Sequence, residues 1–311
     1  MTPTSRSASP TSPASPGGPR APGAARIWWL AARPATLAAA VSPVLAGTAV
    51  AVHDGAVRTL PGLGALVVAL AIQVGTNYAN DYSDHVRGAD RRRVGPLRAA
   101  SSGIVPPEQV RLAAFAAFGV AAAAGVAVAL ATSWVLVPLG ALAVAAGWLY
   151  TGGPRPYGYA GLGELFVFVF FGLLATAGTV YVHELRVPPL AWASGCATGS
   201  LACAILAVNN LRDIETDAQA GKRTLAVRIG RPATRALIGA FLAAALLVPV
   251  VVVGLGWASA WALLPLLTAP AALAVLRGTA SRDAPVLVRA LRRTAVTEVW
   301  WALLWAVGLL L

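Results

Sequence analysis

The chain has 311 residues, of which 58% are hydrophobic and only 12% are charged, and its mean hydropathy is +0.70. So little polar surface cannot cover a water-soluble globule of this size, and the composition excludes that class. Apolar segments of roughly 17 to 25 residues, long enough to cross ~30 Å of hydrocarbon, recur along the chain. The alternating pattern of a membrane barrel is absent, so we expect an all-α, polytopic membrane protein.

Residues 1–26 are rich in proline, serine, glycine and alanine and have no apolar centre, which predicts a disordered cytosolic tail and not a signal peptide. Residues 27–311 would form one intramembrane domain of about nine helices. The expected spans, in chain order, are 35–52, 60–82, 109–131, 134–151, 161–182, 189–209, 236–255, 258–276 and 294–311.

The basic residues support this count. Of the 24 lysines and arginines, all but Arg58 and Arg186 fall in segments that nine helices place on the side of the N-terminus. The positive-inside rule makes that side the cytosol, as in a bacterial cell membrane. The net charge of +12 is then explained by topology and by attraction to anionic lipid. Nucleic-acid binding is disfavoured because the basic residues are spread over separate loops.

Two acidic stretches, 77–90 and 209–224, each follow directly on an apolar span. Together they hold half of the 12 acidic residues, namely Asp81, Asp84, Asp90, Asp213, Glu215 and Asp217. Both preceding spans run from outside to inside in the expected topology, so the two stretches would emerge on the same cytosolic face. A single acidic cluster at a helix end is commonly solvated surface. Two such clusters at equivalent ends favour a shared site.

The second stretch predicts metal chemistry. In a continuous helix, Asn209, Asp213 and Asp217 recur every four residues and share one face. Their oxygen atoms suit a hard divalent cation, and the Lys222-Arg223 pair adds positive charge for a bound anion. A substrate with a diphosphate head and a long lipid tail satisfies all of these features, if its tail enters a central cavity that opens to the cytosol.

These residues resemble the UbiA superfamily of intramembrane aromatic prenyltransferases over nearly all the chain after the tail. Residues 80–84 are similar to the start of its N-D-x-x-D-x-x-x-D motif, and 213–217 to its second, D-x-x-x-D motif. Where the first motif ends in Asp, this chain has Gly88, with Asp90 two residues on. That variant resembles the menaquinone-pathway branch of the family. Further segments of similarity are 33–34, 94–98, 102–103, 150–164 and 209–230.

The resemblance implies transfer of a prenyl chain from polyprenyl diphosphate to 1,4-dihydroxy-2-naphthoate with Mg²⁺ as cofactor. The implied metal ligands are Asn80, Asp84, Asp213 and Asp217, and Asp81 joins the last three as catalytic. The expected diphosphate partners are Arg91, Arg98, Arg212, Lys222 and Arg223. The residues expected to border the aromatic acceptor are Arg33, Tyr150, Tyr157 and Glu164.

Two alternatives remain open on the residues alone. Another aromatic acceptor within the same superfamily would need the same acidic motifs. A secondary transporter would also carry carboxylates in membrane helices, although those should lie near the midplane on broken helices. The sequence does not give the prenyl chain length or the oligomeric state.

Overall fold

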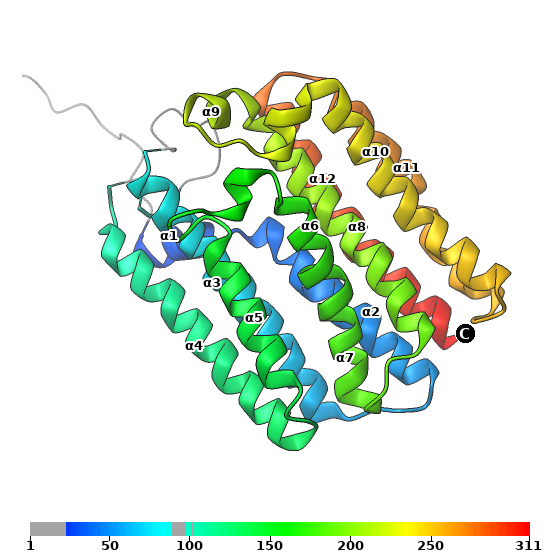
Figure 1. Ribbon diagram of the computed structural model, residues 1–311. Coiled ribbons are helices and arrows are strands. Elements are labelled where there is room, and N and C mark those ends of the chain that lie inside the picture. Colours follow the sequence, from blue (N-terminus) through cyan, green and yellow to red (C-terminus); the bar gives the residue numbers. More distant parts are fainter. Residues whose placement is uncertain (1–22, 89–97, 101–102) are drawn as a thin grey trace, which may run out of the picture.

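The computed structural model describes residues 23–88, 98–100 and 103–311, and every regular element within these ranges is a helix. The helices form an elongated bundle whose long members run roughly side by side (Figure 1). Of the predicted tail, residues 24–26 belong to the first helix, and residues 1–22 lie outside the described ranges.

The elements fall into two groups along the chain. The first group is α1 (Ala24–Ala31), the short turn η1 (Pro34–Thr36), α2 (Ala38–His53), α3 (Thr59–Val86), α4 (Pro107–Ala131), α5 (Leu136–Leu149) and the turn η2 (Tyr157–Ala160). The second group is α6 (Gly163–Val167), η3 (Phe168–Leu174), α7 (Ala175–Glu184), α8 (Pro189–Arg212), α9 (Ile214–Gln219), α10 (Leu225–Gly254), η4 (Ala260–Thr268), α11 (Ala269–Gly278) and α12 (Ala284–Leu310).

Each of the nine predicted spans coincides with a helix, but three helices extend well beyond the prediction. The helix α3 continues about one turn past the predicted end at 82, and α10 and α12 begin about ten residues before their predicted starts. The added turns are polar, and hydropathy marks only the part of a helix that lipid surrounds. The first acidic stretch therefore lies within the end of α3 and does not follow it.

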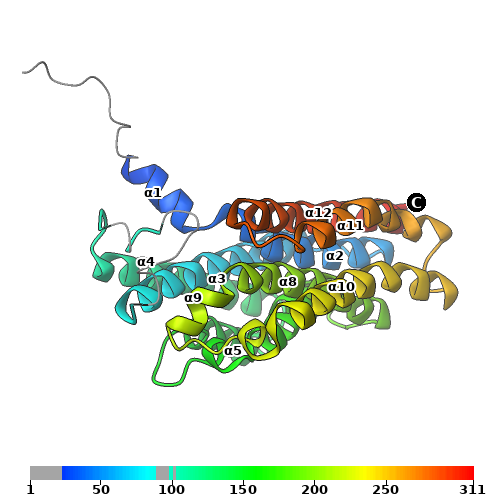
Figure 2. The same cartoon turned by 90° about the horizontal axis from the view of Figure 1, so that it is seen from above.

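Six helices are long and apolar enough to cross a membrane. They are Thr59–Val86, Pro107–Ala131, Gly163–Glu184, Pro189–Arg212, Leu225–Gly254 and Ala260–Gly278. The count is seven if the N-terminal helices, which meet at a bend of 53°, are taken as one span; α1 projects from the bundle at this bend (Figure 2). The helix α5 is shorter, and α12 is not among the six. Nine crossings therefore stay a prediction.

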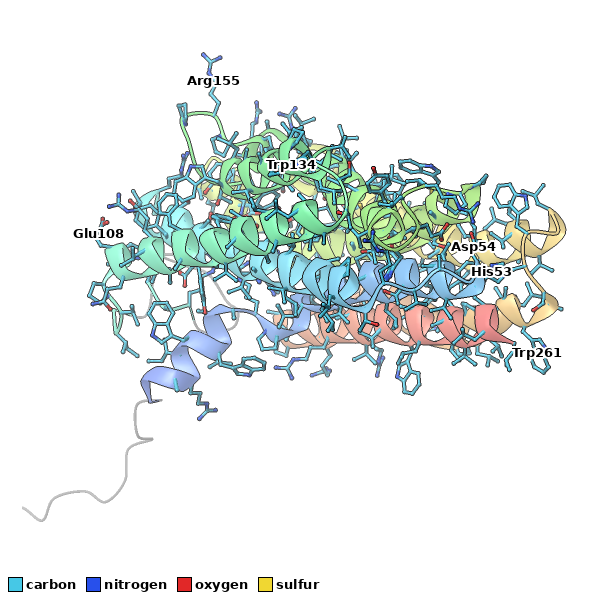
Figure 3. The ribbon with its side chains drawn as sticks, turned by 90° about the horizontal axis from the view of Figure 1, so that it is seen from below. His53, Asp54, Glu108, Trp134, Arg155 and Trp261 are labelled. Carbon is cyan, nitrogen blue, oxygen red and sulfur yellow. The ribbon has the colours of Figure 1, made fainter. Side chains whose placement is uncertain are left out.

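Contacts between turns show which helix ends lie together. At one end, the Tyr159 carbonyl accepts from the Arg223 amide, and the Ser281 carbonyl accepts from Arg231. We call this the acidic end, because α3 and α8 finish there. At the opposite end, Arg58 donates to the Ala131 carbonyl. Figure 3 labels His53, Asp54 and Trp261 at the opposite end and Glu108 and Arg155 at the acidic end.

The helix α8 is the centre of the bundle. Of its apolar window, 78% is buried, against 28–39% for the other five candidate spans. Two tryptophans of α12, Trp301 and Trp305, stack with ring centroids 5.3 Å apart and are fully buried. Trp305 donates to Ser194 of α8 at 3.0 Å. Because α8 carries the second acidic stretch at its end, packing along its whole length fixes where that stretch lies.

A glycine contact sets the spacing between α8 and the middle of the 163–184 helix. The segment η3 is a π-helical turn, and its Gly172 lies directly against Gly199 of α8. A Cβ atom added to Gly199 would lie 3.0 Å from the Gly172 Cα and 3.1 Å from the Phe168 carbonyl oxygen. Both of these are backbone atoms that cannot rotate away. Small residues of this kind allow membrane helices to pack closely.

We predict that Gly199→Val destabilises the protein by roughly 1–3 kcal/mol, because the added methyl groups force the two backbones apart. Equilibrium unfolding in mixed detergent micelles measures the change. The matched control is Gly119→Ala on α4, where an added Cβ meets nothing within 4 Å. Equal stability of the Gly199→Val and wild-type proteins would show that the close contact is absent.

Candidate active site

One cavity of about 890 Å³ runs along the inside of the bundle. Its mouth lies at the acidic end, where Asp84, Asp217 and Lys222 line it. Its far part reaches Val128 near the end of α4 and Leu136 at the start of α5, so it extends along most of the length of the helices. The mouth is charged and the deeper wall is apolar, which suits a ligand with an anionic head and a long hydrocarbon tail.

The first acidic stretch places Asp84 in the cavity mouth. Its side chain is buried, and both carboxylate oxygens are engaged: Arg98 donates to Oδ2 at 2.7 Å and the Tyr159 hydroxyl donates to Oδ1 at 2.7 Å. The Lys222 ammonium lies 3.9 Å from Oδ2. Three chain segments therefore converge on one carboxylate.

The two residues before it play different structural parts. Asn80 lines the cavity, and its amide oxygen accepts a hydrogen bond from Thr151 at 2.7 Å. Asp81, which we expected to be catalytic, is buried and does not line the cavity. Its Oδ2 accepts from the backbone amides of Ala99 at 2.7 Å and Ala100 at 3.4 Å. Asp81 thus holds the segment that carries Arg98.

The second stretch is not one continuous helix, which corrects our expectation. The helix α8 ends at Arg212 and α9 begins at Ile214, with Asp213 between them at φ −95° and ψ 8°. The Arg212 guanidinium folds back onto the Asp213 carboxylate through two hydrogen bonds of 2.7 and 2.6 Å. This fork anchors the bend, because paired Arg–carboxylate bonds fix geometry as well as charge. Asn209, Asp213 and Asp217 all line the cavity nevertheless.

Lys222 connects the two stretches. Its ammonium lies 3.7 Å from Asp217 and 3.9 Å from Asp84. The chain reaches this position through Gly221, whose φ of +73° suits glycine at the end of a helix. Burial raises the pKa of Asp217 to about 6; the Asp213 and Asp84 carboxylates act in the same direction, and Lys222 opposes them. The mouth thus concentrates negative charge against a single lysine.

Tyr159, which the sequence analysis missed, lies between the two stretches. Besides its bond to Asp84, its ring lies 5.2 Å from the Lys222 ammonium and 5.3 Å from the Arg87 guanidinium. Burial and the nearby Asp84 carboxylate raise the pKa of Tyr159, so it donates as a neutral phenol. The turn η2 therefore straps the mouth. Its signal in the sequence is a third tyrosine just after the two that we singled out.

An aromatic wall lies beside the mouth. Tyr157 stacks on Phe166 with ring centroids 3.9 Å apart, and Phe166 stacks on Phe170 at 6.0 Å. Tyr150 meets Tyr157 edge to face at 5.5 Å. All four side chains line the cavity. Such a wall can hold a flat aromatic ligand, and its ring faces attract a cation.

The remaining expected site residues are divided by the structure. Arg33 and Arg212 line the cavity, whereas Glu164 does not. The Glu164 carboxylate is buried and accepts a hydrogen bond from Asn210 at 3.1 Å. Arg223 is exposed outside the mouth, and Arg91 lies outside the described residues.

The oxygen atoms at the mouth fit a divalent cation in kind but do not form a complete cage. Among the described residues, no three His, Cys, Asp or Glu side chains converge closely enough to hold a metal ion. Arg98 and Arg212 occupy oxygens of Asp84 and Asp213. Mg²⁺ characteristically takes one or two carboxylates and completes its shell with water and substrate phosphate. The donor set therefore fits Mg²⁺ together with a phosphate-bearing ligand.

Known proteins match this chain in sequence. The UbiA prenyltransferase family matches residues 40–296. The 1,4-dihydroxy-2-naphthoate octaprenyltransferase of Mycobacterium tuberculosis is 46% identical over 277 residues, which cover 89% of this chain and 94% of that protein.

Solved structures share the fold. A UbiA homolog from Aeropyrum pernix K1 superposes with a TM-score of 0.64 at 16% identity, covering 92% of this chain and 98% of that one. A UbiA homolog from Archaeoglobus fulgidus, bound to DMAPP and Mg²⁺, gives a TM-score of 0.58 at 16% identity, covering 90% and 99%. At this identity the likeness establishes the arrangement of helices.

We predict that Arg98→Met destabilises the protein by roughly 3–5 kcal/mol, because it leaves the Asp84 carboxylate buried with one cation fewer. Adding Asp84→Asn removes the orphaned charge and should restore most of the loss. Unfolding of both single variants and the double variant in mixed micelles completes the cycle. Simple addition of the two single losses would contradict a direct coupling.

Proposed function

The chain belongs to the UbiA prenyltransferase family, and we propose that it transfers a polyprenyl chain from polyprenyl diphosphate to 1,4-dihydroxy-2-naphthoate, releasing diphosphate and CO₂ to give demethylmenaquinone. The observation that carries the proposal is 46% identity to a 1,4-dihydroxy-2-naphthoate octaprenyltransferase over nearly the full length of both chains. The cavity supports it, because a charged mouth and a long apolar interior match a diphosphate with a polyprenyl tail.

Mg²⁺ would be held by the oxygens of Asn80, Asp84, Asp213 and Asp217, all of which line the cavity mouth. The A. fulgidus homolog with DMAPP and Mg²⁺ supports this choice of metal. When bound, Mg²⁺ supplies Lewis-acid stabilisation of the negative charge on the leaving diphosphate. Asp81 acts indirectly in this proposal, since it positions the segment that carries Arg98.

The diphosphate would lie among Arg98, Arg212 and Lys222, the expected cationic partners that line the mouth. Their guanidinium and ammonium groups neutralise its charge as the allylic C–O bond breaks. Arg223 contributes through its backbone, which bonds to Tyr159 and holds the strap across the mouth. Tyr159 keeps Asp84 oriented by donating to one of its oxygens.

The aromatic wall would hold the naphthoate and face the allylic carbon. Tyr157, Phe166 and Phe170 present ring surfaces to the cavity, and such surfaces stabilise a developing cation. The new C–C bond forms at the ring carbon that bears the carboxylate, and the electron pair left when CO₂ departs restores the aromatic ring. Glu164 supports this wall from behind through Asn210, and Arg33 lines the cavity where it can meet the acceptor carboxylate.

The apolar interior would exclude water and take up the tail. Glycines of α4 and α5, Gly125 and Gly140, line its far part, where an added Cβ would meet almost nothing. The tail therefore has room to pass between these helices. Exclusion of water matters because an allylic cation exposed to it is hydrolysed to an alcohol.

We also propose nine crossings of a bacterial cell membrane, with the N-terminus and the acidic end in the cytosol. The three additional spans would be α2, α5 and α12. The proposal is supported by the basic residues of the turns, since Arg58 and Arg186 alone lie at the opposite end in this topology.

The acceptor is tested by side-by-side turnover. Purified protein with Mg²⁺ and a long polyprenyl diphosphate should convert 1,4-dihydroxy-2-naphthoate and release diphosphate and CO₂ in equal amounts. 4-Hydroxybenzoate should react far more slowly. Prenylation of 4-hydroxybenzoate alone would refute the acceptor assignment and leave the family reaction intact.

The carboxylates are tested by neutral variants of similar shape. Asp84→Asn and Asp217→Asn should each lower turnover at least about 100-fold, because each removes charge that positions the metal and diphosphate. The control is Glu215→Gln in the same stretch, whose side chain is 64% exposed and should stay within about threefold of wild type. Equal losses in all three variants would contradict the assigned roles.

The topology is tested by labelling single cysteines in intact cells, after Cys196 and Cys203 are replaced by Ala. A membrane-impermeant maleimide should label Val57→Cys at the opposite end and spare Ala218→Cys in α9 until the cells are opened. Labelling of Ala218→Cys from outside would invert the orientation.

A further inference from the structure

A second, smaller pocket of about 180 Å³ opens at the acidic end, apart from the main cavity. It lies where the first turns of α10 face the turn that joins α11 to α12 (Figure 1). None of its lining residues lines the main cavity. Its lining residues are Arg231, Pro232, Arg235, Thr279, Ala280 and Arg282.

Three guanidinium groups therefore surround one small hollow, with little charge to balance them. The nearest carboxylate is Glu215, 3.7 Å from Arg231 and 64% exposed, so water screens it strongly. Arg235 and Arg282 form no ion pair with any residue that the structure describes. Like charges gathered beside a low-dielectric bundle repel each other, and a bound anion would relieve that repulsion.

The hydrogen-bond donors point to the same conclusion. Arg231 is held in place by the Leu211 carbonyl at 2.8 Å and the Ser281 carbonyl at 3.2 Å. The Nε atom of Arg235 is shielded from solvent and finds no acceptor among the described residues. A buried N–H without an acceptor costs free energy, and an oxyanion in the pocket would satisfy it.

We propose that this pocket, which we call the arginine pocket, binds a phosphate group. The phosphate can belong to an anionic phospholipid or to a soluble phosphate ester, since both present the same oxyanion to the arginines. Basic pockets between membrane helices on the cytosolic side bind such lipid head groups. The exposed Leu273 on α11 gives the acyl chains of a lipid an apolar surface beside the pocket.

The pocket is separate from catalysis but touches the second acidic stretch. Arg231 donates to the last turn of α8 through Leu211 and faces Glu215 of α9. A phosphate in the pocket would therefore steady the residue that ties α10 to the bend at Asp213. This function goes beyond prenyl transfer and stands whether or not the proposed acceptor is correct.

Native mass spectrometry of the delipidated full chain in detergent tests the proposal. The probes are dioleoylphosphatidylglycerol, dioleoylphosphatidylcholine and inorganic phosphate. The test variant carries Arg235→Gln and Arg282→Gln. The matched control carries Arg277→Gln and Arg289→Gln, two exposed arginines on the neighbouring helices that lose the same charge outside the pocket.

Wild type and control should bind phosphatidylglycerol saturably, and the test variant should bind it about tenfold more weakly or worse. Phosphatidylcholine should bind poorly to all three. Loss of phosphatidylglycerol binding in the test variant alone identifies a lipid as the source of the phosphate. Saturable inorganic phosphate binding, lost in the test variant and without lipid preference, identifies a soluble source.

Two results would overturn the proposal. Equal weakening in the test and control variants would reduce it to general surface charge. No saturable binding of any phosphate probe to wild type would remove it altogether. A third variant, Arg235→Lys with Arg282→Lys, keeps the charge, and its partial recovery of binding separates loss of the site from misfolding.

Discussion

Neutralisation of the carboxylates at the cavity mouth is the constraint on which this structure depends. Asp84, Asp213 and Asp217 gather at the end of a low-dielectric bundle, where unpaired charge is costly. Each is met by a cation from another part of the chain or from the adjacent residue, and Lys222 lies within 3.9 Å of both stretches. The fold is thus arranged so that two helix ends, far apart in sequence, share their counter-charges.

The surrounding elements serve this arrangement. The central helix α8 is fixed along its length by the glycine contact with η3 and by the tryptophans of α12, so that its last turn cannot wander from α3. The strap η2 then joins the two stretches through Tyr159, which bonds to Asp84 by its side chain and to Arg223 by its backbone. Below this rigid mouth the cavity is apolar. A charged head and a hydrocarbon tail therefore have separate, adjoining environments.

The sequence predicted the helical class, the position of each long helix and the meeting of the two acidic stretches. Hydropathy and charge asymmetry report on lipid contact, which is why these features were accessible. It did not predict the bend at Asp213, because periodicity takes no account of the Arg212 fork that anchors it. It also did not distinguish Asp84 in the cavity from Asp81 on the backbone amides, since adjacent turns of one helix look alike in a motif. Tyr159 was missed because its position depends on a loop fold.

The central claim is that neither acidic stretch binds metal fully without the diphosphate that joins them. Calorimetric titration of Mg²⁺ into the protein, with and without an unreactive geranyl thiolodiphosphate, measures this coupling once the protein-free analogue titration is subtracted. The account predicts that the analogue tightens Mg²⁺ binding at least about tenfold, within the usual range of coupling between sites. Replacement of either Asp84 or Asp217 by Asn should abolish that gain. Equal Mg²⁺ affinity with and without the analogue, or a gain that survives either replacement, would contradict it.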